Sequence, residues 1–204
     1  MAFFKTKKDK APEPKRSAVE LGLDYLHDVV YILAVVLLLF TFCVRVVIVS
    51  GSSMFSTLAD GDCLLLLNRP LCGELERGDI VVASMDRFKN GEAIVKRVIA
   101  TEGQTVDIDF LHGIVYVDGV ALEEEYIYSP TNMAEGMEFP LVVREGCLFL
   151  MGDNRMDSRD SRAPEIGQVD EREILGRAFF LAMPGTGRGE YTVQWDPGRI
   201  GGLN

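Results

Sequence analysis

An uncharged apolar run near the N-terminus constrains this chain more than any other feature of its sequence. Residues 29–44 contain no charged side chain, and their leucines, valines and phenylalanines would cover every face of a helix. Such a helix extends about 24 Å, less than the roughly 30 Å hydrocarbon core of a bilayer. Arg45 can reach the headgroups with its guanidinium, and residues 46–49 can continue the apolar path. The run therefore predicts one transmembrane helix over residues 25–45.

The charges around this run predict how the chain crosses the membrane. The preceding tail, residues 1–24, carries six lysine and arginine residues among prolines, which is the composition of a solvated segment. The positive-inside rule places such a tail in the cytoplasm and residues 46–204 on the outer side. A cleavable signal peptide has a similar basic and apolar organisation, but no small-x-small cleavage site ends this run. We therefore expect a retained, single-pass anchor in the cell membrane.

Composition narrows the classes of protein that remain. A length of 204 residues suits one principal domain besides the anchor. The formal net charge of −10, with no basic stripe beyond the tail, argues against a nucleic-acid partner. Cys63, Cys72 and Cys147 lie without C-x-x-C spacing, so a zinc site is poorly supported, and the sequence leaves their redox state open. His27 and His112 are the only histidines, which argues against a Ser-His-Asp triad and a histidine metal cluster.

The region after residue 61 is typical of antiparallel β-structure. Short apolar segments, many of them β-branched, alternate with turn residues, and residues 115–119 have the pattern of a hairpin arm. The glycine-rich chain after Pro184 predicts an irregular surface segment. We therefore predict a mainly β, antiparallel domain preceded by one N-terminal transmembrane helix. The expected strands are residues 63–67, 80–83, 94–99, 105–108, 114–117, 141–143, 148–151 and 174–181.

Lys96 is a candidate general base. It lies within an apolar stretch, and on a strand Ile94 and Val98 share its face while Val95 and Arg97 point the other way. A lysine amine on an apolar face loses hydration, which lowers its pKa and lets the neutral form accept a proton. The alternative is a lysine on an edge strand whose amine extends to solvent.

Two further polar segments have both an ordinary and a chemical interpretation. The serine-rich residues 50–56 can simply be a polar exit loop from the membrane, and residues 151–162 can be a solvated loop with Asx turns and exposed ion pairs. Together with Lys96, the same segments offer a serine that a neutral lysine activates and a polar loop that holds the two in place.

Taken in order behind one apolar run, these segments resemble bacterial type I signal peptidases (leader peptidases) of the Gram-positive kind. The resemblance extends from about Phe40 to Met183. Five segments carry it: the end of the span at Arg45, and residues 53–58 (SMFSTL), 77–82 (RGDIVV), 95–99 (VKRVI) and 152–162 (GDNRMDSRDSR).

The resemblance implies a role for each matching residue. Ser53 corresponds to the nucleophile and Lys96 to the general base, with Ser158 orienting the lysine amine. The Ser53 N–H meets the oxyanion, and Gly51 stands where some relatives have a serine hydroxyl. Asp160 and Arg162 correspond to a structural pair. Gly152, Asp153 and Asn154 are expected to pack beneath the catalytic dyad formed by Ser53 and Lys96. The residues expected to bind substrate are Ser50, Met54, Leu58, Ile94 and Val95.

Three departures from the family pattern affect loops rather than the dyad. Ser56 stands where the family usually has proline, which removes a φ constraint after the nucleophile. Residues 100–104 (ATEGQ) replace the family's Gly-x-Pro-Gly-Asp, and Met156 replaces an expected aspartate. We therefore expect local differences in loop geometry.

The activity that the resemblance implies is a membrane-anchored serine endopeptidase that removes signal peptides after small-x-small sites through an acyl-enzyme. We expect no metal or organic cofactor, signal-peptide-bearing preproteins and the lipid bilayer as partners, and a monomer. Two alternatives remain at this point. One is a self-cleaving Ser-Lys peptidase of the repressor type, although the DNA-binding module of that type is absent from this sequence. The other is a β-rich extracellular binding protein whose serine loop is only a linker.

Overall fold

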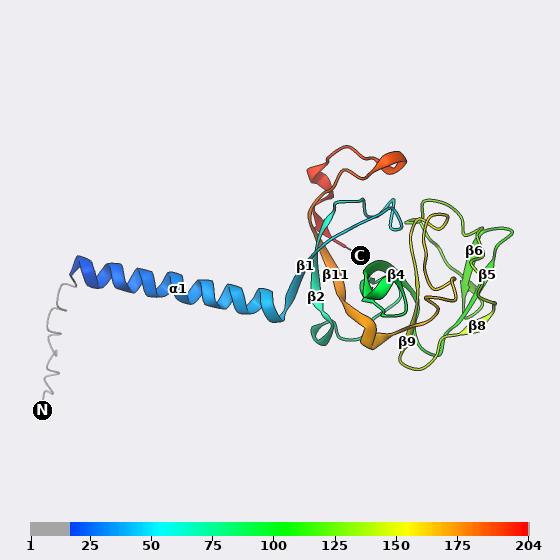
Figure 1. Cartoon of the computed structure of the whole chain (residues 1–204), viewed down its shortest axis with the longest axis horizontal. Helices are drawn as coiled ribbons and strands as arrows, with labels where there is room; N and C mark the ends of the chain where they lie inside the picture. Colours follow the sequence, from blue (N-terminus) through cyan, green and yellow to red (C-terminus); the bar gives the residue numbers. More distant parts are fainter. Residues whose placement is uncertain (1–16, 204) are drawn as a thin grey trace, which may run out of the picture. The chain divides into compact units, whose positions relative to one another are not determined.

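The structure is a computed structural model that describes residues 17–203, in which the chain divides into two compact units at Phe40 and Thr41. The basic part of the expected cytoplasmic tail lies outside the described residues. The first unit contains helix α1 except for its last two residues, and the second contains all the strands (Figure 1).

Helix α1 spans Ala18–Phe42 and begins at a capping box. The Ser17 hydroxyl accepts the Glu20 N–H at 3.2 Å, and the Glu20 carboxylate accepts the Ser17 N–H at 2.8 Å. With 25 residues, α1 is long and apolar enough to cross a membrane.

The helix differs from the predicted range of residues 25–45 at both ends. The capping box starts it earlier, and it ends at Phe42 because the next residues form strand β1, Val44–Ile48. Arg45 and residues 46–48 therefore belong to a strand that pairs with β2, and they do not continue the apolar helix. The β-branched side chains of this segment favour the strand over the helix.

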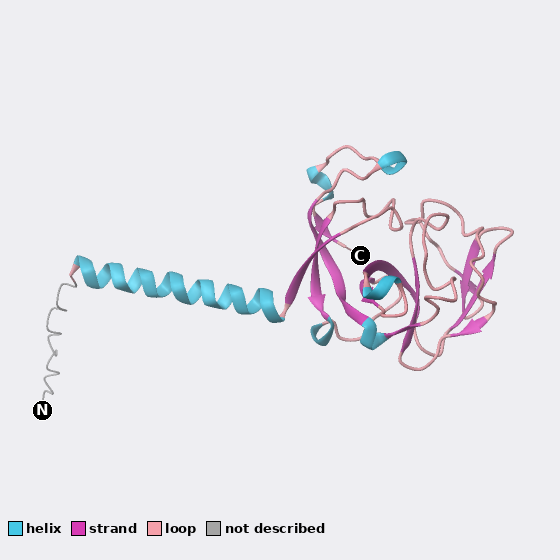
Figure 2. Ribbon diagram, viewed as in Figure 1, coloured by secondary structure: helices cyan, strands magenta, loops and turns pink. Residues whose placement is uncertain are grey.

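The second unit is built from two antiparallel sheets, as the sequence predicts (Figure 2). The larger has the order β1-β2-β11-β3-β4-β9-β10, with β12 paired to β11, and the smaller has the order β7-β6-β5-β8. The strands of the larger sheet after β1 are β2 (Cys63–Asn68), β3 (Ile80–Ser84), β4 (Ala93–Ala100), β9 (Cys147–Met151), β10 (Val169–Asp170), β11 (Ile174–Met183) and β12 (Gly201–Gly202). Those of the smaller sheet are β5 (Thr105–Asp109), β6 (Ile114–Val117), β7 (Val120–Ala121) and β8 (Leu141–Val142).

All eight predicted strands are present, and several connections between strands contain single turns of 3-10 helix. These turns are Arg69–Leu71, Lys89–Gly91, Glu171–Glu173, Gly189–Tyr191 and Pro197–Arg199. The predicted hairpin turn joins β6 to β7, with Asp118 at φ 52° and Gly119 at φ 78°. Positive φ at both central positions is the type I′ geometry that suits the twist of two antiparallel strands.

Strand β4 lies in the interior of the larger sheet, between β3 and β9. From Lys96 to Ala100 every residue is buried, because side chains on both faces of the strand pack against the core. The lysine and the arginine of this strand therefore lie where unpaired charges would be costly.

Candidate active site

Ser53 and Lys96 come together from a loop and a central strand. Ser53 lies in the loop that joins β1 to β2, and Lys96 is the fourth residue of β4. The Nζ atom of Lys96 is 2.6 Å from the Oγ atom of Ser53. Lys96 is only 3% exposed, so its amine is not the solvent-reaching group of an edge strand. The two side chains form a hydrogen-bonded Ser-Lys pair inside the domain.

Burial changes the acid–base chemistry of Lys96. Loss of hydration lowers the pKa of its amine to about 8, although the carboxylates of Asp160 and Asp153 act in the opposite direction. With such a pKa, about a tenth of the amines are neutral at pH 7 and about half are neutral at pH 8. A neutral amine can accept the hydroxyl proton of Ser53 along their hydrogen bond.

Asp160 organises the polar loop behind the lysine. It accepts hydrogen bonds from the Ser158 hydroxyl at 2.8 Å and from the Gly152 N–H at 3.0 Å, and it pairs with the Arg162 guanidinium through both carboxylate oxygens. Burial alone would raise the pKa of Asp160, but the guanidinium of Arg162 holds it below its usual range. Asp160 is therefore an ionised, fully buried acceptor.

The Ser158 hydroxyl has a different hydrogen-bond partner from the one that the family resemblance implies. Its proton is donated to Asp160, not to the amine of Lys96. The physical reason is that an ionised carboxylate is a stronger acceptor than an amine that is largely protonated near neutral pH. Ser158 thus binds the carboxylate whose charge opposes the lowering of the Lys96 pKa.

The buried Asp160–Arg162 pair has an exposed counterpart with the same spacing, Asp170–Arg172. Arg162 has a fully buried side chain, whereas that of Arg172 is 89% exposed. Replacing Arg162 by methionine leaves a buried carboxylate without its partner, and we expect a loss of about 3–5 kcal/mol in the free energy of unfolding. Replacing Arg172 by methionine is expected to cost about 1 kcal/mol or less.

Urea unfolding of the full-length chain in detergent, monitored by tryptophan fluorescence, measures both changes. Equal losses for the two variants would contradict the assignment of Asp160–Arg162 as a structural pair.

Residues 152–154, which were predicted to pack beneath the dyad, contact the backbone of the loop between β1 and β2, here called the serine loop. Asn154 donates its N–H to the carbonyl of Ser53 at 3.0 Å and its side-chain amide to the carbonyl of Ser52 at 3.2 Å. A Cβ atom at Gly152 would lie 2.4 Å from the Ser53 carbonyl oxygen and 2.2 Å from Ser158 Oγ. Only glycine allows this close approach, so Gly152 fixes the distance between the two loops.

The backbone donors near Ser53 have different partners. Gly51 has a φ of +98°, and its N–H donates to Asp60 Oδ1 at 2.7 Å. That N–H is therefore already used. No acceptor for the Ser53 N–H is assigned within residues 17–203. The Ser53 N–H is thus available for an oxyanion, as the resemblance implies.

Sequence reasoning missed a second buried ion pair beside the dyad. Arg97 binds Asp153 through two hydrogen bonds of 2.9 and 2.7 Å, and the Thr57 hydroxyl donates to the same carboxylate at 2.6 Å. The Arg97 guanidinium also lies over the ring of Tyr126, 4.0 Å from its centroid. Arg97 therefore ties β4 to the serine loop. The sequence signal for this buried pair was the position of Arg97, which follows Lys96 in a strand with apolar residues on both faces.

A cleft of about 270 Å³ opens at the dyad. Both Ser53 and Lys96 line it, together with four of the five residues predicted to bind substrate, which are Ser50, Met54, Ile94 and Val95. Leu58, the fifth, is fully buried in the core cluster beneath the loop and does not line the cleft, so the structure contradicts a direct contact between this side chain and substrate. Its apolar side chain supports the loop from below.

The backbone at this cleft has unpaired strand edges. β4 pairs with β3 along Ala93–Arg97, but it pairs with β9 only from Arg97 onward. On the side of β4 that faces away from β3, Ile94 and Val95 therefore have no strand partner in the described part of the chain. β1 is likewise an edge strand that pairs with β2 alone. An extended peptide can add to such edges by backbone hydrogen bonds.

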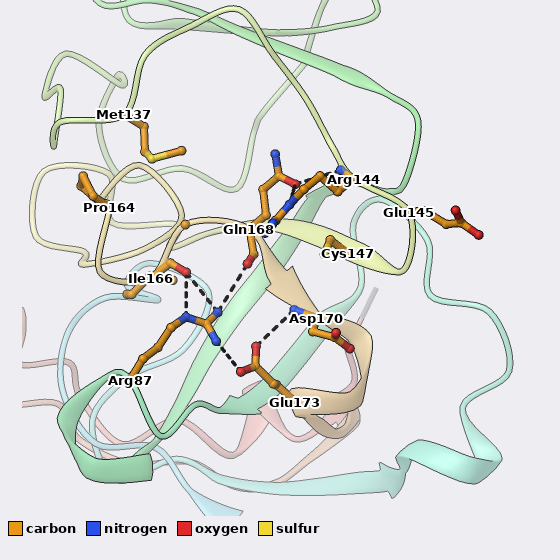
Figure 3. Close-up of a pocket in the computed structure, with 11 residues that line it drawn as sticks. Arg87, Met137, Arg144, Glu145, Cys147, Pro164, Ile166, Gln168, Asp170 and Glu173 are labelled. Carbon is orange, nitrogen blue, oxygen red and sulfur yellow. Dashed lines mark hydrogen bonds and ion pairs between the residues drawn. The ribbon is translucent and has the colours of Figure 1, made fainter.

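A larger hollow of about 800 Å³ does not contain the dyad. Figure 3 shows that both arginines of its lining are paired with neighbouring groups. Arg87 lies against the Ile166 carbonyl and Glu173, and Arg144 lies against Gln168. Because its two cations are already paired, we assign no chemistry to this hollow.

Comparisons with known proteins place the chain in a family. Residues 22–183 match the family model described as signal peptidase, peptidase S26. The chain belongs to the signal peptidase family. It is 35% identical over 165 residues to signal peptidase I of Bacillus amyloliquefaciens, a match that covers 76% of this chain and 82% of that protein.

Other relatives of this signal peptidase family member include a probable signal peptidase I-1 of Synechocystis, 36% identical over 155 residues, which cover 70% of this chain and 72% of the relative. A solved structure of a signal peptidase I from Enterococcus faecalis is 30% identical and covers 51% of this chain and 96% of that chain, with a TM-score of 0.42. Membership in peptidase S26 makes the chain a serine peptidase.

Proposed function

We propose that this enzyme removes signal peptides from exported precursors, with Ser53 as the nucleophile and Lys96 as the general base. The observation that carries the proposal is the 2.6 Å hydrogen bond between Ser53 Oγ and the Nζ atom of a buried lysine whose pKa is lowered to about 8. A serine hydroxyl beside a fully protonated surface lysine would lack a base.

The reaction proceeds in two steps. In the first, neutral Lys96 takes the proton of Ser53 Oγ while the oxygen attacks the peptide carbonyl, and the Ser53 N–H stabilises the oxyanion. The lysine then gives this proton to the departing amine, which leaves an acyl group on Ser53. In the second step, Lys96 deprotonates a water molecule that releases the signal peptide and regenerates the serine.

The dyad cleft supports a preference for small side chains before the scissile bond. Its lining includes the apolar side chains of Met54, Ile94 and Val95, and its volume of about 270 Å³ is shared among several substrate residues. A precursor strand that adds to the free edges of β4 and β1 would direct alternate side chains into this cleft. Small-x-small sites have small residues at such alternate positions.

We propose that α1 anchors the chain as a single-pass membrane protein. The basic residues 1–24 would lie in the cytoplasm and residues 46–204 on the outer side, with one chain acting as a monomer. The 25-residue helix, which is apolar and carries no charged side chain from Val29 onward, supports the anchor, and the basic tail supports its direction. Anchoring raises the local concentration of the enzyme beside precursors held in the same bilayer.

Purified full-length chain in detergent tests this function on a preprotein with alanine at the first and third positions before the cleavage site. We expect a single cut directly after the alanine at the first position before the cleavage site. Replacing that alanine by phenylalanine should lower kcat/KM about 100-fold or more, because a large side chain does not fit a site built for a methyl group. The cut is located by mass spectrometry of the products. Equal cleavage of both precursors would contradict the proposed specificity.

A further inference from the structure

The chain after β11 returns to the loop that carries the nucleophile. We call residues 184–203 the C-terminal segment; it lies beyond the part of the chain that matches the family model. Its Gly187 N–H donates to the Asp60 carbonyl at 3.0 Å, and its Gly185 N–H donates to Asp62 Oδ1 at 2.7 Å. A Cβ atom at Gly185 would lie 2.4 Å from the Asp60 carbonyl oxygen, so the two backbones are in direct contact.

A buried ion pair holds the segment in this position. Arg199 binds the fully buried carboxylate of Asp62 at 2.6 and 3.0 Å, and the same carboxylate accepts the Ala59 N–H at 2.8 Å. The neighbouring Asp60 accepts the Gly51 N–H at 2.7 Å and faces Arg188 of the segment at 3.4 Å. The segment is thus anchored to Asp60 and Asp62, which follow Ser53, and Asp60 in turn binds Gly51, which precedes it.

The segment adds an aromatic side chain to the serine loop. The ring of Tyr191 lies 5.3 Å from that of Phe55 and 6.1 Å from that of Tyr128, and the rings of Phe55 and Tyr128 are 5.0 Å apart. Phe55 is two residues after the nucleophile. Such edge and tilted arrangements are favourable and leave ring faces available to a further apolar group.

A second pocket of about 210 Å³ lies between the segment and the loop, formed by residues 50–52, Phe55, Arg188 and Tyr191 among others. It shares residues 50–52 with the dyad cleft, but neither Ser53 nor Lys96 lines it. The volume is below the roughly 300–1,000 Å³ of a site for a small molecule and suits a single side chain. Asp60 and Arg188 offset each other's charge at its rim, which favours a neutral occupant.

We propose that this pocket is a second substrate subsite, in which Tyr191 and Phe55 bind an apolar side chain of the precursor just after the scissile bond. The inference rests on the proposed function. The dyad cleft, with its unpaired strand edges, accommodates the residues before the bond. The second pocket borders the same residues 50–52 and is also lined by Phe55, Ala59 and Asp60, which follow Ser53. Tyr191 is then a specificity-determining residue supplied by the C-terminal segment.

The test uses precursors that are identical up to the cleavage site and carry phenylalanine, leucine or serine at the first or the second position after it. For wild-type full-length chain we expect kcat/KM to be about tenfold higher with an apolar residue than with serine at one of these positions. Tyr191→Ala should reduce this ratio to about one, whereas Tyr191→Phe should retain it because the ring remains.

Trp195→Ala is the matched control, because Trp195 is an exposed aromatic residue of the same segment that does not line the pocket. It should leave the ratio unchanged. The inference is overturned if Tyr191→Ala keeps the wild-type ratio, if it lowers kcat/KM equally for all precursors, or if the wild type has no preference after the cleavage site. None of these results contradicts the proposed function, which would instead be overturned by a wild type that cleaves no precursor.

Discussion

Replacing Ser53 by alanine is expected to lower kcat/KM for precursor processing by on the order of 10⁴-fold or more, because the attacking oxygen is removed. The substitution deletes one oxygen atom from a loop residue whose main-chain bond to Asn154 does not need the hydroxyl. The variant should therefore fold and insert like the wild type. Processing of a preprotein, followed by gel shift and mass spectrometry, measures the loss.

Ser56→Ala is a suitable control for Ser53→Ala. Ser56 belongs to the same loop, but it is exposed and its hydroxyl makes only a long contact of 3.4 Å with the Tyr126 carbonyl. We expect this variant to process the preprotein at nearly the wild-type rate. If Ser53→Ala retained the activity of Ser56→Ala, the nucleophile would have to be another group.

Replacing Lys96 by methionine is expected to change activity and stability in opposite directions. Methionine has a similar length but cannot accept the Ser53 proton, so processing should fall by on the order of 10⁴-fold. The wild-type amine, in contrast, costs free energy when it is buried in its charged form. The lowering of its pKa from 10.5 to about 8 corresponds to a few kcal/mol at most. Lys96→Met should therefore raise the free energy of unfolding by about 1–3 kcal/mol near pH 7.

The same pKa shift predicts two pH dependences. Wild-type kcat/KM should rise as the pH increases through about 8, because the neutral amine is the base. Between about pH 8 and 10.5 the unfolded chain holds a proton that the folded chain has lost, so the wild type gains stability with pH over this range and approaches the methionine variant. Activity measured by precursor cleavage and stability measured by urea unfolding, each from pH 6 to 10, test both. An activity maximum in acid, or a destabilised methionine variant, would contradict the assigned base.

The sequence predicted the strands well because each carries its own local signal. β-branched residues bounded by turn residues identify β3 and β6 without knowledge of their partners. The prediction was wrong at residues 43–45, which it placed in the membrane helix although α1 ends at Phe42 and β1 begins at Val44. Hydrophobicity does not distinguish a membrane helix from a paired strand. This segment forms a strand because it pairs with β2, which is a non-local interaction.

The dyad could be predicted because Lys96 stands in an apolar strand and Ser53 lies in a segment that resembles a known family. Arg97 was placed on the opposite face, as alternation requires, but that face is also buried, and the buried Asp153 provides its partner. The C-terminal segment gave no local signal. Its role depends on Tyr191 and Arg199, whose partners Phe55 and Asp62 are more than a hundred residues earlier in the chain.

Labelling with a serine-directed acylating probe tests the Ser-Lys dyad most directly. Full-length wild type, Ser53→Ala and Lys96→Met are treated at pH 8.5, and the adduct is located by peptide mass spectrometry. The dyad predicts a single adduct on Ser53 of the wild type, with none on either variant, because Ser53 reacts only when neutral Lys96 takes its proton. An adduct on another serine, or equal labelling of Ser53 in the Lys96→Met variant, would contradict it.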